Sequence, residues 1–227
     1  MTNLNLEAID TDGAIREGAE AVAGDTRLSF LRKGAMAGGA AIGGGAILGS
    51  LVAPSLASAK GAPPVKPFGK GDIGILNFAL TLEYLERAFY NEATSKGKIT
   101  DPKTATFLKV VTHDERAHVA FLKKALGSKA VAEPKFNFHG TTADLAMFQQ
   151  TAYTLENTGV HAYLGQAGNI KTPAYLLAAA SIVTIEARHS GAIGSIINKP
   201  INASGAFDTP LTANQILTAV KGTKFIV

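Results

Sequence analysis

The chain contains no cysteine among its 227 residues. Without thiolates it cannot form disulfide bonds, iron–sulfur clusters or zinc sites built on cysteine. Motifs for binding NAD, flavin or haem are missing as well. The formal net charge is +4, and the basic residues are spread along the chain rather than interleaved with aromatic residues. This distribution indicates a solvated basic surface, and no nucleic-acid partner is expected.

The N-terminal residues have the composition of an export signal. Residues 1–25 are polar and acidic and are predicted to be disordered, and residues 26–33 (TRLSFLRK) resemble a twin-arginine signal in which Leu28 replaces the second arginine. A Gly/Ala-rich apolar stretch at 34–53 and the small-x-small pattern ending at Ala59 follow. We therefore expect export to the periplasm or the exterior, with cleavage near Ala59. The alternative is an N-terminal membrane anchor, because the apolar stretch is about long enough to span a bilayer.

The remaining chain is predicted to be all-α and to form one domain over residues 72–227, preceded by a signal region at 1–59 and a Pro-rich linker at 60–71. Apolar residues recur at helical spacing, and strand signals are nearly absent after residue 72. Four long helices and a short fifth one are predicted at 72–95, 102–126, 142–167, 173–198 and 213–221.

Capping signals set the predicted ends of these helices. Asp101 before Pro102 begins the second helix, and Gly97 and Gly127 end the first and the second. A capping-box-like pattern from Thr141 to Asp144 begins the third, and a capping box at Thr212 begins the fifth. The connection over 128–141 is too long for a tight turn, so it predicts a crossover between the second and third helices.

The sequence Glu-x-x-His occurs twice, from Glu115 to His118 and from Glu186 to His189. Positions i and i+3 of a helix share a face, so each pair can present one carboxylate and one imidazole to the same point. Carboxylates and imidazoles in such a pattern are metal ligands.

A single glutamate precedes each of these pairs at a similar interval. Thr-Leu-Glu ends at Glu83 in the first half and at Glu156 in the second, and each is followed by a tyrosine at the seventh position, Tyr90 or Tyr163. The chain therefore contains an internal repeat. In the third and fourth helices the candidate ligands Glu156, Glu186 and His189 lie within the apolar stripe, and a buried carboxylate needs a compensating partner.

Four helices that supply Glu, Glu-x-x-His, Glu and Glu-x-x-His resemble the ligand set of di-iron and di-manganese carboxylate proteins. The chain is similar to the ferritin-like superfamily over roughly residues 70–200, and the segment LNFALTLEYLE at 76–86 resembles its secreted, desiccation-related bacterial branch. The resemblance implies a four-helix bundle with a long crossover, and redox chemistry in stress protection. Because cysteine is absent, the rubredoxin-type iron centre of some ferritin-like peroxidases is excluded.

Six residues are therefore predicted to bind two iron or manganese ions. Glu83 and Glu156 each bind one ion, Glu115 and Glu186 bridge both, and His118 and His189 each cap one. Four carboxylates balance two divalent ions, and the oxygen-rich donor set suits iron or manganese, although zinc also binds such sites. Tyr90 and Tyr163 are predicted either to be core tyrosines or to hydrogen-bond a ligand carboxylate.

Glu86 is the competing ligand on the first helix. Glu83 is preferred because it shares the spacing to a following tyrosine with Glu156, and Glu86 is expected to face solvent or to pair with a neighbouring helix. The histidines at 113, 139 and 161 are not predicted to be ligands.

The reaction stays open between ferroxidation, peroxide reduction and manganese catalase activity, all acting on small oxygen species or metal ions. Any reductant would come from a partner, and a homodimer is one possible assembly. The alternatives are a non-enzymatic stress or desiccation scaffold with a structural or empty site, and iron storage. The segment 199–211 and the short last helix disfavour a storage cage.

Overall fold

The computed structural model describes residues 68–201 and 205–227. The predicted export signal and most of the predicted linker lie outside these ranges. None of the helices in the described ranges is both long enough and apolar enough to cross a membrane.

Five α-helices make up nearly all of the regular structure in the described ranges, which confirms the predicted all-α class. They are α5 (Gly71–Lys96), α6 (Pro102–Leu126), α7 (Leu145–Ala167), α8 (Pro173–Ile196) and α9 (Ala213–Thr223). A short 3₁₀ helix, η1 (Gly127–Lys129), follows α6. The β-structure described is limited to one isolated antiparallel bridge between Phe136 and Ile226.

Most helix ends follow the capping signals. The Asp101 carboxylate accepts a hydrogen bond from the backbone N–H of Thr104, and Gly97 closes α5 in the left-handed conformation with φ 60°. At the start of α9, Thr212 and Gln215 form both bonds of a capping box.

The start of α7 and the end of α8 differ from the prediction. Asp144 is the N-cap of α7 and accepts from the N–H of Met147 at 2.8 Å, so the capping-box prediction at Thr141 is wrong. The Thr141 hydroxyl instead donates to the carbonyl of Phe138 within a turn. The end of α8 comes at Ile196, before Asn198, because Asn198 adopts φ 57° and leaves the helix.

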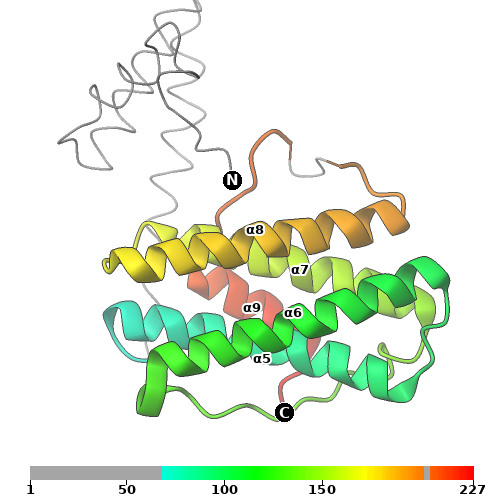
Figure 1. The fold of residues 1–227 in the computed structure, drawn as a ribbon, viewed down its shortest axis with the longest axis horizontal. Helices are drawn as coiled ribbons and strands as arrows, with labels where there is room; N and C mark the ends of the chain where they lie inside the picture. Colours follow the sequence, from blue (N-terminus) through cyan, green and yellow to red (C-terminus); the bar gives the residue numbers. More distant parts are fainter. Residues whose placement is uncertain (1–67, 202–204) are drawn as a thin grey trace, which may run out of the picture. The chain divides into compact units, whose positions relative to one another are not determined.

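The four long helices form a bundle of two hairpins (Figure 1). One hairpin pairs α5 with α6, and the other pairs α7 with α8. Across the bundle α5 lies beside α7 and α6 beside α8, while α9 packs on α7. The long connection between α6 and α7 provides the predicted crossover.

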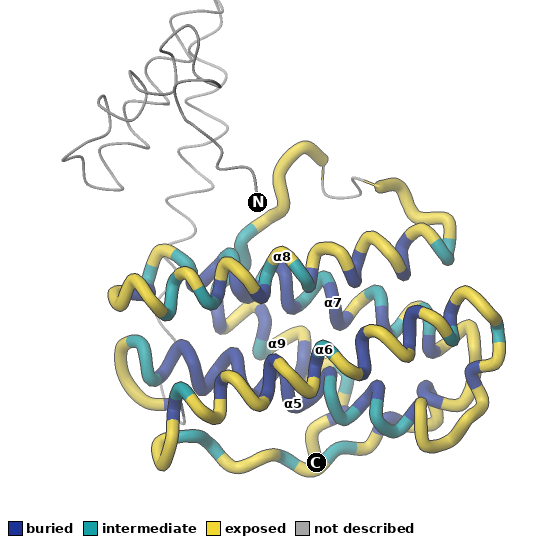
Figure 2. Tube along the Cα trace, viewed as in Figure 1, coloured by how far each residue is buried: buried dark blue, intermediate teal, exposed yellow. Residues whose placement is uncertain are grey.

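Buried residues line the inside of the bundle along all four helices (Figure 2). They form two apolar clusters. One contains Phe89 stacked on Phe148 with ring centroids 5.2 Å apart, and the other contains Leu80 and Leu122. Buried glutamates and histidines lie on the same four helices.

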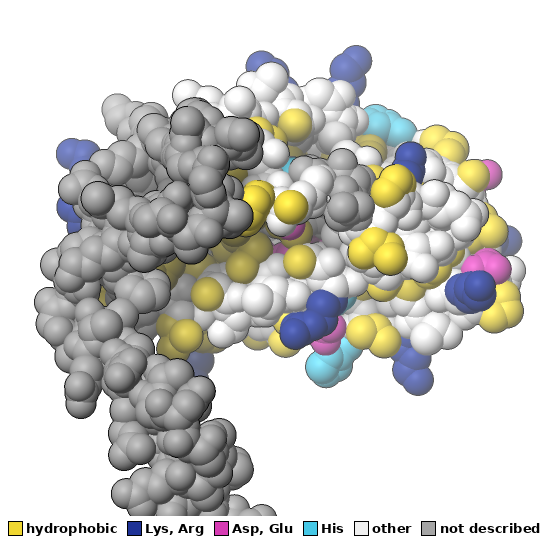
Figure 3. All heavy atoms as spheres, turned by 90° about the horizontal axis from the view of Figure 1, so that it is seen from above, with side chains coloured by type: hydrophobic (Ala, Val, Ile, Leu, Met, Phe, Trp, Pro, Cys, Tyr) yellow, Lys and Arg dark blue, Asp and Glu magenta, His cyan; other side chains and the backbone are white. Residues whose placement is uncertain are grey.

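Figure 3 shows how charged side chains are distributed on one face of the described residues. Lysine and arginine side chains are spread around that face rather than gathered in one patch. This agrees with their spread along the sequence.

Candidate metal centre

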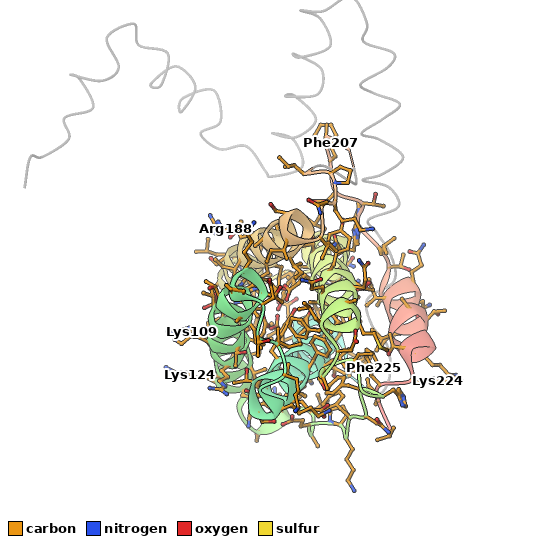
Figure 4. The ribbon with its side chains drawn as sticks, turned by 90° about the vertical axis from the view of Figure 1, so that its right-hand side faces the viewer. Lys109, Lys124, Arg188, Phe207, Lys224 and Phe225 are labelled. Atoms are coloured by element: carbon orange, nitrogen blue, oxygen red, sulfur yellow. The ribbon has the colours of Figure 1, made fainter. Side chains whose placement is uncertain are left out.

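The four long helices each direct acidic or imidazole side chains into the middle of the bundle. Seen end-on in Figure 4, side chains fill the space between the helices, whereas Lys109, Lys124 and Arg188 point outward. The predicted ligands are all buried, and their four carboxylates are 0% exposed. They come from α5 (Glu83), α6 (Glu115, His118), α7 (Glu156) and α8 (Glu186, His189).

The six residues form two groups that could each hold a metal ion. One group comprises Glu83, Glu115, His118 and Glu186, and the other Glu115, Glu156, Glu186 and His189. Within each group the candidate donor atoms lie within 4.8 Å of one another. Glu115 and Glu186 belong to both groups, which is the arrangement that two bridging carboxylates require. None of the chain's other three histidines belongs to either group.

Both imidazoles turn Nδ1 toward the carboxylates. In the first group His118 Nδ1 lies 3.2 Å from both Glu83 Oε2 and Glu186 Oε1. In the second, His189 Nδ1 lies 3.2 Å from Glu156 Oε2. Each histidine therefore has Nδ1 available as the atom that would bind a metal.

The two groups differ at the far side of the imidazole. His189 Nε2 lies 3.1 Å from Asp114 Oδ2, whereas His118 Nε2 has no comparable carboxylate partner among the described residues. An Nε2–H that donates to Asp114 leaves Nδ1 with its lone pair directed at the carboxylates. The prediction omitted Asp114. Its only signal in the sequence is its position next to Glu115.

The two tyrosines connect the halves of the repeat crosswise. The Tyr163 hydroxyl donates to Glu83 Oε1 at 2.5 Å, and the Tyr90 hydroxyl donates to Glu156 Oε1. Each tyrosine thus bonds the glutamate of the other half rather than the one in its own segment. The sequence left two interpretations of these tyrosines open. The structure supports the second one, because both hydroxyls donate to candidate ligand carboxylates.

Glu86 is buried, which corrects the expectation that it faces solvent. It is only 3% exposed, and burial together with the charges of Glu186, Glu115 and other glutamates raises its pKa well above the ordinary value. Glu83 and Glu86 are three residues apart, so both carboxylates lie on one helix face. This spacing was the feature of the sequence that could have predicted the burial of Glu86. The centre therefore contains five glutamates, so four carboxylates balance two divalent ions only if Glu86 keeps its proton.

Gly159 on α7 provides room for this crowding. A Cβ atom at this position would lie 2.9 Å from Glu186 Oε2 and 3.3 Å from Glu86 Oε1. Both distances are shorter than ordinary contacts, so the two carboxylates can approach α7 only because the residue is glycine. The T-L-E repeat does not reveal this requirement.

Without metal ions the cluster retains protons. Burial raises the pKa of Glu115 to about 8, and burial with the charges of Glu115 and Glu156 raises that of Glu186 well above its ordinary value. Burial alone would lower the pKa of His189, but hydrogen bonds to Glu115 and Glu156 raise it to about 11. The pKa of His118 is raised in the same way by the carboxylates around it.

The donor atoms have too few hydrogen-bond donors around them, and divalent cations would compensate their charge. Four buried oxygens accept no well-aligned hydrogen bond within the described residues: Glu83 Oε2, Glu115 Oε1 and both oxygens of Glu186. A histidine Nδ1 lies 3.2–3.3 Å from three of them, and Glu186 Oε2 has no such neighbour among the described residues. Unpaired buried carboxylate oxygens are strongly disfavoured, and a metal ion is the usual compensation where several converge. Carboxylates with a few imidazoles suit iron or manganese.

A bundle with this crossover and two buried Glu-x-x-His segments has the architecture of the helical bundles in which carboxylates and histidines can hold metal ions. Comparison with protein families agrees: the ferritin-like domain family matches residues 71–199, so the chain belongs to that family. The match includes all four helices that supply the candidate ligands. A search of curated proteins found no match.

The metal-free protein is expected to lose stability as the pH rises from about 5 to about 8. Glu115, Glu186 and both histidines have folded-state pKa values above their ordinary values, so the folded state binds more protons than the unfolded state. Thermal unfolding of the metal-free protein across this range measures the slope. The slope should shrink in Glu115→Gln, and a stability that rises with pH would contradict the proton-loaded cluster.

Gly159→Ala is expected to weaken metal binding by about ten-fold or more, because the added Cβ displaces the Glu186 carboxylate. The stability of the metal-free fold should change far less, since the helix preference of alanine over glycine, about 1 kcal/mol, offsets part of the cost of moving two flexible carboxylate ends. Calorimetric titration with Mn²⁺ and thermal unfolding measure the two effects. Gly191→Ala is the matched control, because a Cβ at that helical position meets nothing within 4 Å. Equal Mn²⁺ affinity in both variants would show that Gly159 does not shape the centre.

Proposed function

We propose that this chain is an exported ferritin-like protein that holds two iron or manganese ions and uses them for redox chemistry on dioxygen or peroxide, in protection against oxidative stress. The observation that carries the proposal is the pair of donor groups that share Glu115 and Glu186. Two ions with common carboxylate ligands lie close enough to act jointly on one small oxygen species.

The roles of the side chains follow from their contacts. Glu83 with His118 would hold one ion, Glu156 with His189 would hold the other, and the shared glutamates would hold both. The metal ions, when bound, would supply the electron transfer that no side chain of this set can supply. The protein's own contribution is to keep the donors in place in a water-poor interior.

Hydrogen bonds around the donors support that positioning role. Tyr163 and Tyr90 each occupy one oxygen of a terminal glutamate, so the other oxygen would be left to bind an ion. Asp114 orients His189 alone, which makes the two metal positions chemically unequal. Unequal positions suit a centre in which the two ions differ in affinity or in oxidation state during the reaction.

The proposal predicts two ions per chain after anaerobic titration with Fe²⁺ or Mn²⁺. Glu115→Gln combined with Glu186→Gln removes the shared charges, so this variant should bind less than one ion per chain. Glu133→Gln is the control, since that carboxylate is 41% exposed and pairs with Arg87 away from the candidate donors. Two ions retained by the double variant would contradict the proposed ligand set.

Turnover then separates a redox centre from a scaffold. The Fe²⁺-loaded wild-type protein should oxidise its iron when dioxygen is added, or the Mn²⁺-loaded protein should consume hydrogen peroxide. Glu83→Ala combined with Glu156→Ala should abolish whichever activity the wild-type protein has, while the circular dichroism spectrum still shows the wild-type helix content. Binding of two ions without either activity would favour the structural scaffold instead.

Export is proposed from the N-terminal pattern that ends in Ala57-Ser58-Ala59. N-terminal sequencing of the protein purified from the periplasmic or secreted fraction should begin at Lys60. A full-length chain in the membrane fraction would instead indicate an anchor, and a full-length chain in the cytoplasmic fraction would contradict export.

A further inference from the structure

A cleft opens between α5 and α6, close to the loop that joins these two helices. Its volume is about 350 Å³. Clefts that bind small molecules range from roughly 300 to 1,000 Å³, so this one has room for a small organic molecule. None of the six predicted metal ligands lines it, and no other acidic residue of the described ranges does so either.

The floor of the cleft is apolar, and its polar groups already have partners. Ala93, Ile99 and Leu108 line it and are only 0%, 6% and 7% exposed. The hydroxyls of Thr94 and Thr112 lie 3.1 Å apart, and the Thr112 hydroxyl donates to the carbonyl of Leu108 at 2.6 Å. The Thr94 hydroxyl is therefore the donor between the two, and neither proton is left for a ligand. Such a floor suits the apolar body of a molecule.

Basic side chains of α6 form the rim of the cleft. Lys109, His113 and Arg116 line it and are exposed, and their spacing of four and three residues places them on one face of the helix. Arg116 donates to Asn91 Oδ1 through Nε at 2.8 Å and through Nη2 at 2.5 Å. These bonds fix the guanidinium and leave Nη1 without a partner among the described residues. A fixed guanidinium next to a cleft suits an anionic oxygen.

No carboxylate neutralises this rim. The acidic residues of α6 are Asp114 and Glu115, and Glu115 is fully buried in the metal centre. The Asp114 oxygens lie 3.0 Å from His113 Nδ1 and 3.1 Å from His189 Nε2. Lys109 forms no ion pair with a described residue, and like charges at such spacing on a helix repel one another. An external anion would relieve this repulsion.

We propose that the cleft binds a small organic anion, with its carboxylate at Lys109 and Arg116 and its apolar body on the floor. An inorganic anion would use the rim alone, and a neutral apolar molecule would use the floor alone. A molecule with both parts uses the whole cleft. The site is separate from the candidate metal centre, and the inference does not depend on the proposed redox function.

Benzoate is the probe, because it combines one carboxylate with an apolar ring. Equilibrium dialysis of the protein against benzoate should give one site per chain with a Kd of about 1 mM or less. Benzamide has nearly the same shape without the charge, and acetate has the charge without the ring. Both should bind at least about five-fold more weakly than benzoate, because each lacks one of the two contributions.

Substitutions in the cleft test where benzoate binds. Lys109→Gln and, separately, Arg116→Gln should each weaken its binding about five-fold, since each removes one cation from the rim. Ala105→Leu should weaken it as well, because Ala105 lines the cleft and a larger side chain would fill it. Lys124→Gln is the matched control and should change nothing, because Lys124 is exposed on the same helix and lies outside the cleft.

Several results would overturn the inference. Benzamide that binds as tightly as benzoate would show that the cations do not take part, and inorganic phosphate that binds more tightly would show the same for the floor. An unchanged Kd in both rim variants, or in a folded Ala105→Leu variant, would place benzoate elsewhere. Two rim variants keep the test decisive if one of them does not fold. None of the variants alters a predicted metal ligand, so the result is independent of the number of metal ions bound.

Discussion

A carboxylate inside a protein needs a hydrogen bond, a proton or a cation, and five glutamates share the centre of this bundle. The surrounding structure provides all three. Tyrosine hydroxyls bond two of the carboxylates, the histidines approach these two and two more through Nδ1, and raised pKa values keep protons on several of them. The oxygens that accept no hydrogen bond are the ones that two cations would bind. Helix packing holds this arrangement in place, because both apolar clusters contain residues of the helices that carry the glutamates.

Much of this could be predicted because the ligand pattern repeats. Two Glu-x-x-His pairs and two Thr-Leu-Glu segments identified four helices and six side chains, and the structure brings all six together in two groups. The prediction that Glu86 faces solvent is wrong because it used only the spacing between a glutamate and the following tyrosine. Burial depends instead on the helix face, and Glu86 shares its face with Glu83. Asp114 could not be found, since its partner His189 lies on another helix and only the packing of α6 against α8 brings them together. The predicted start of α7 is wrong because Thr141 and Asp144 are both suitable N-cap residues. The Thr141 hydroxyl bonds the carbonyl of Phe138 in the preceding turn, which leaves Asp144 to cap the helix.

The repeat describes a symmetry that the finished site only partly keeps. Both halves supply the same ligands in the same order, and the two tyrosine bonds are equivalent. Asp114, in contrast, contacts only His189 of the second donor group. The elements that the repeat makes symmetric would hold the two ions, whereas Asp114 would affect how one of them reacts. A pattern search that assumes full symmetry therefore recovers the ligands and misses the features that distinguish the two ions.

The crossed tyrosine bonds make the two hairpins depend on each other. In each helix hairpin the tyrosine points to the glutamate of the other hairpin, so a hairpin alone leaves its own glutamate without this partner. The hairpins therefore cannot separate without leaving two buried carboxylates short of a hydrogen bond, which is strongly disfavoured. The same two bonds that orient the candidate ligands thus also join the halves of the bundle.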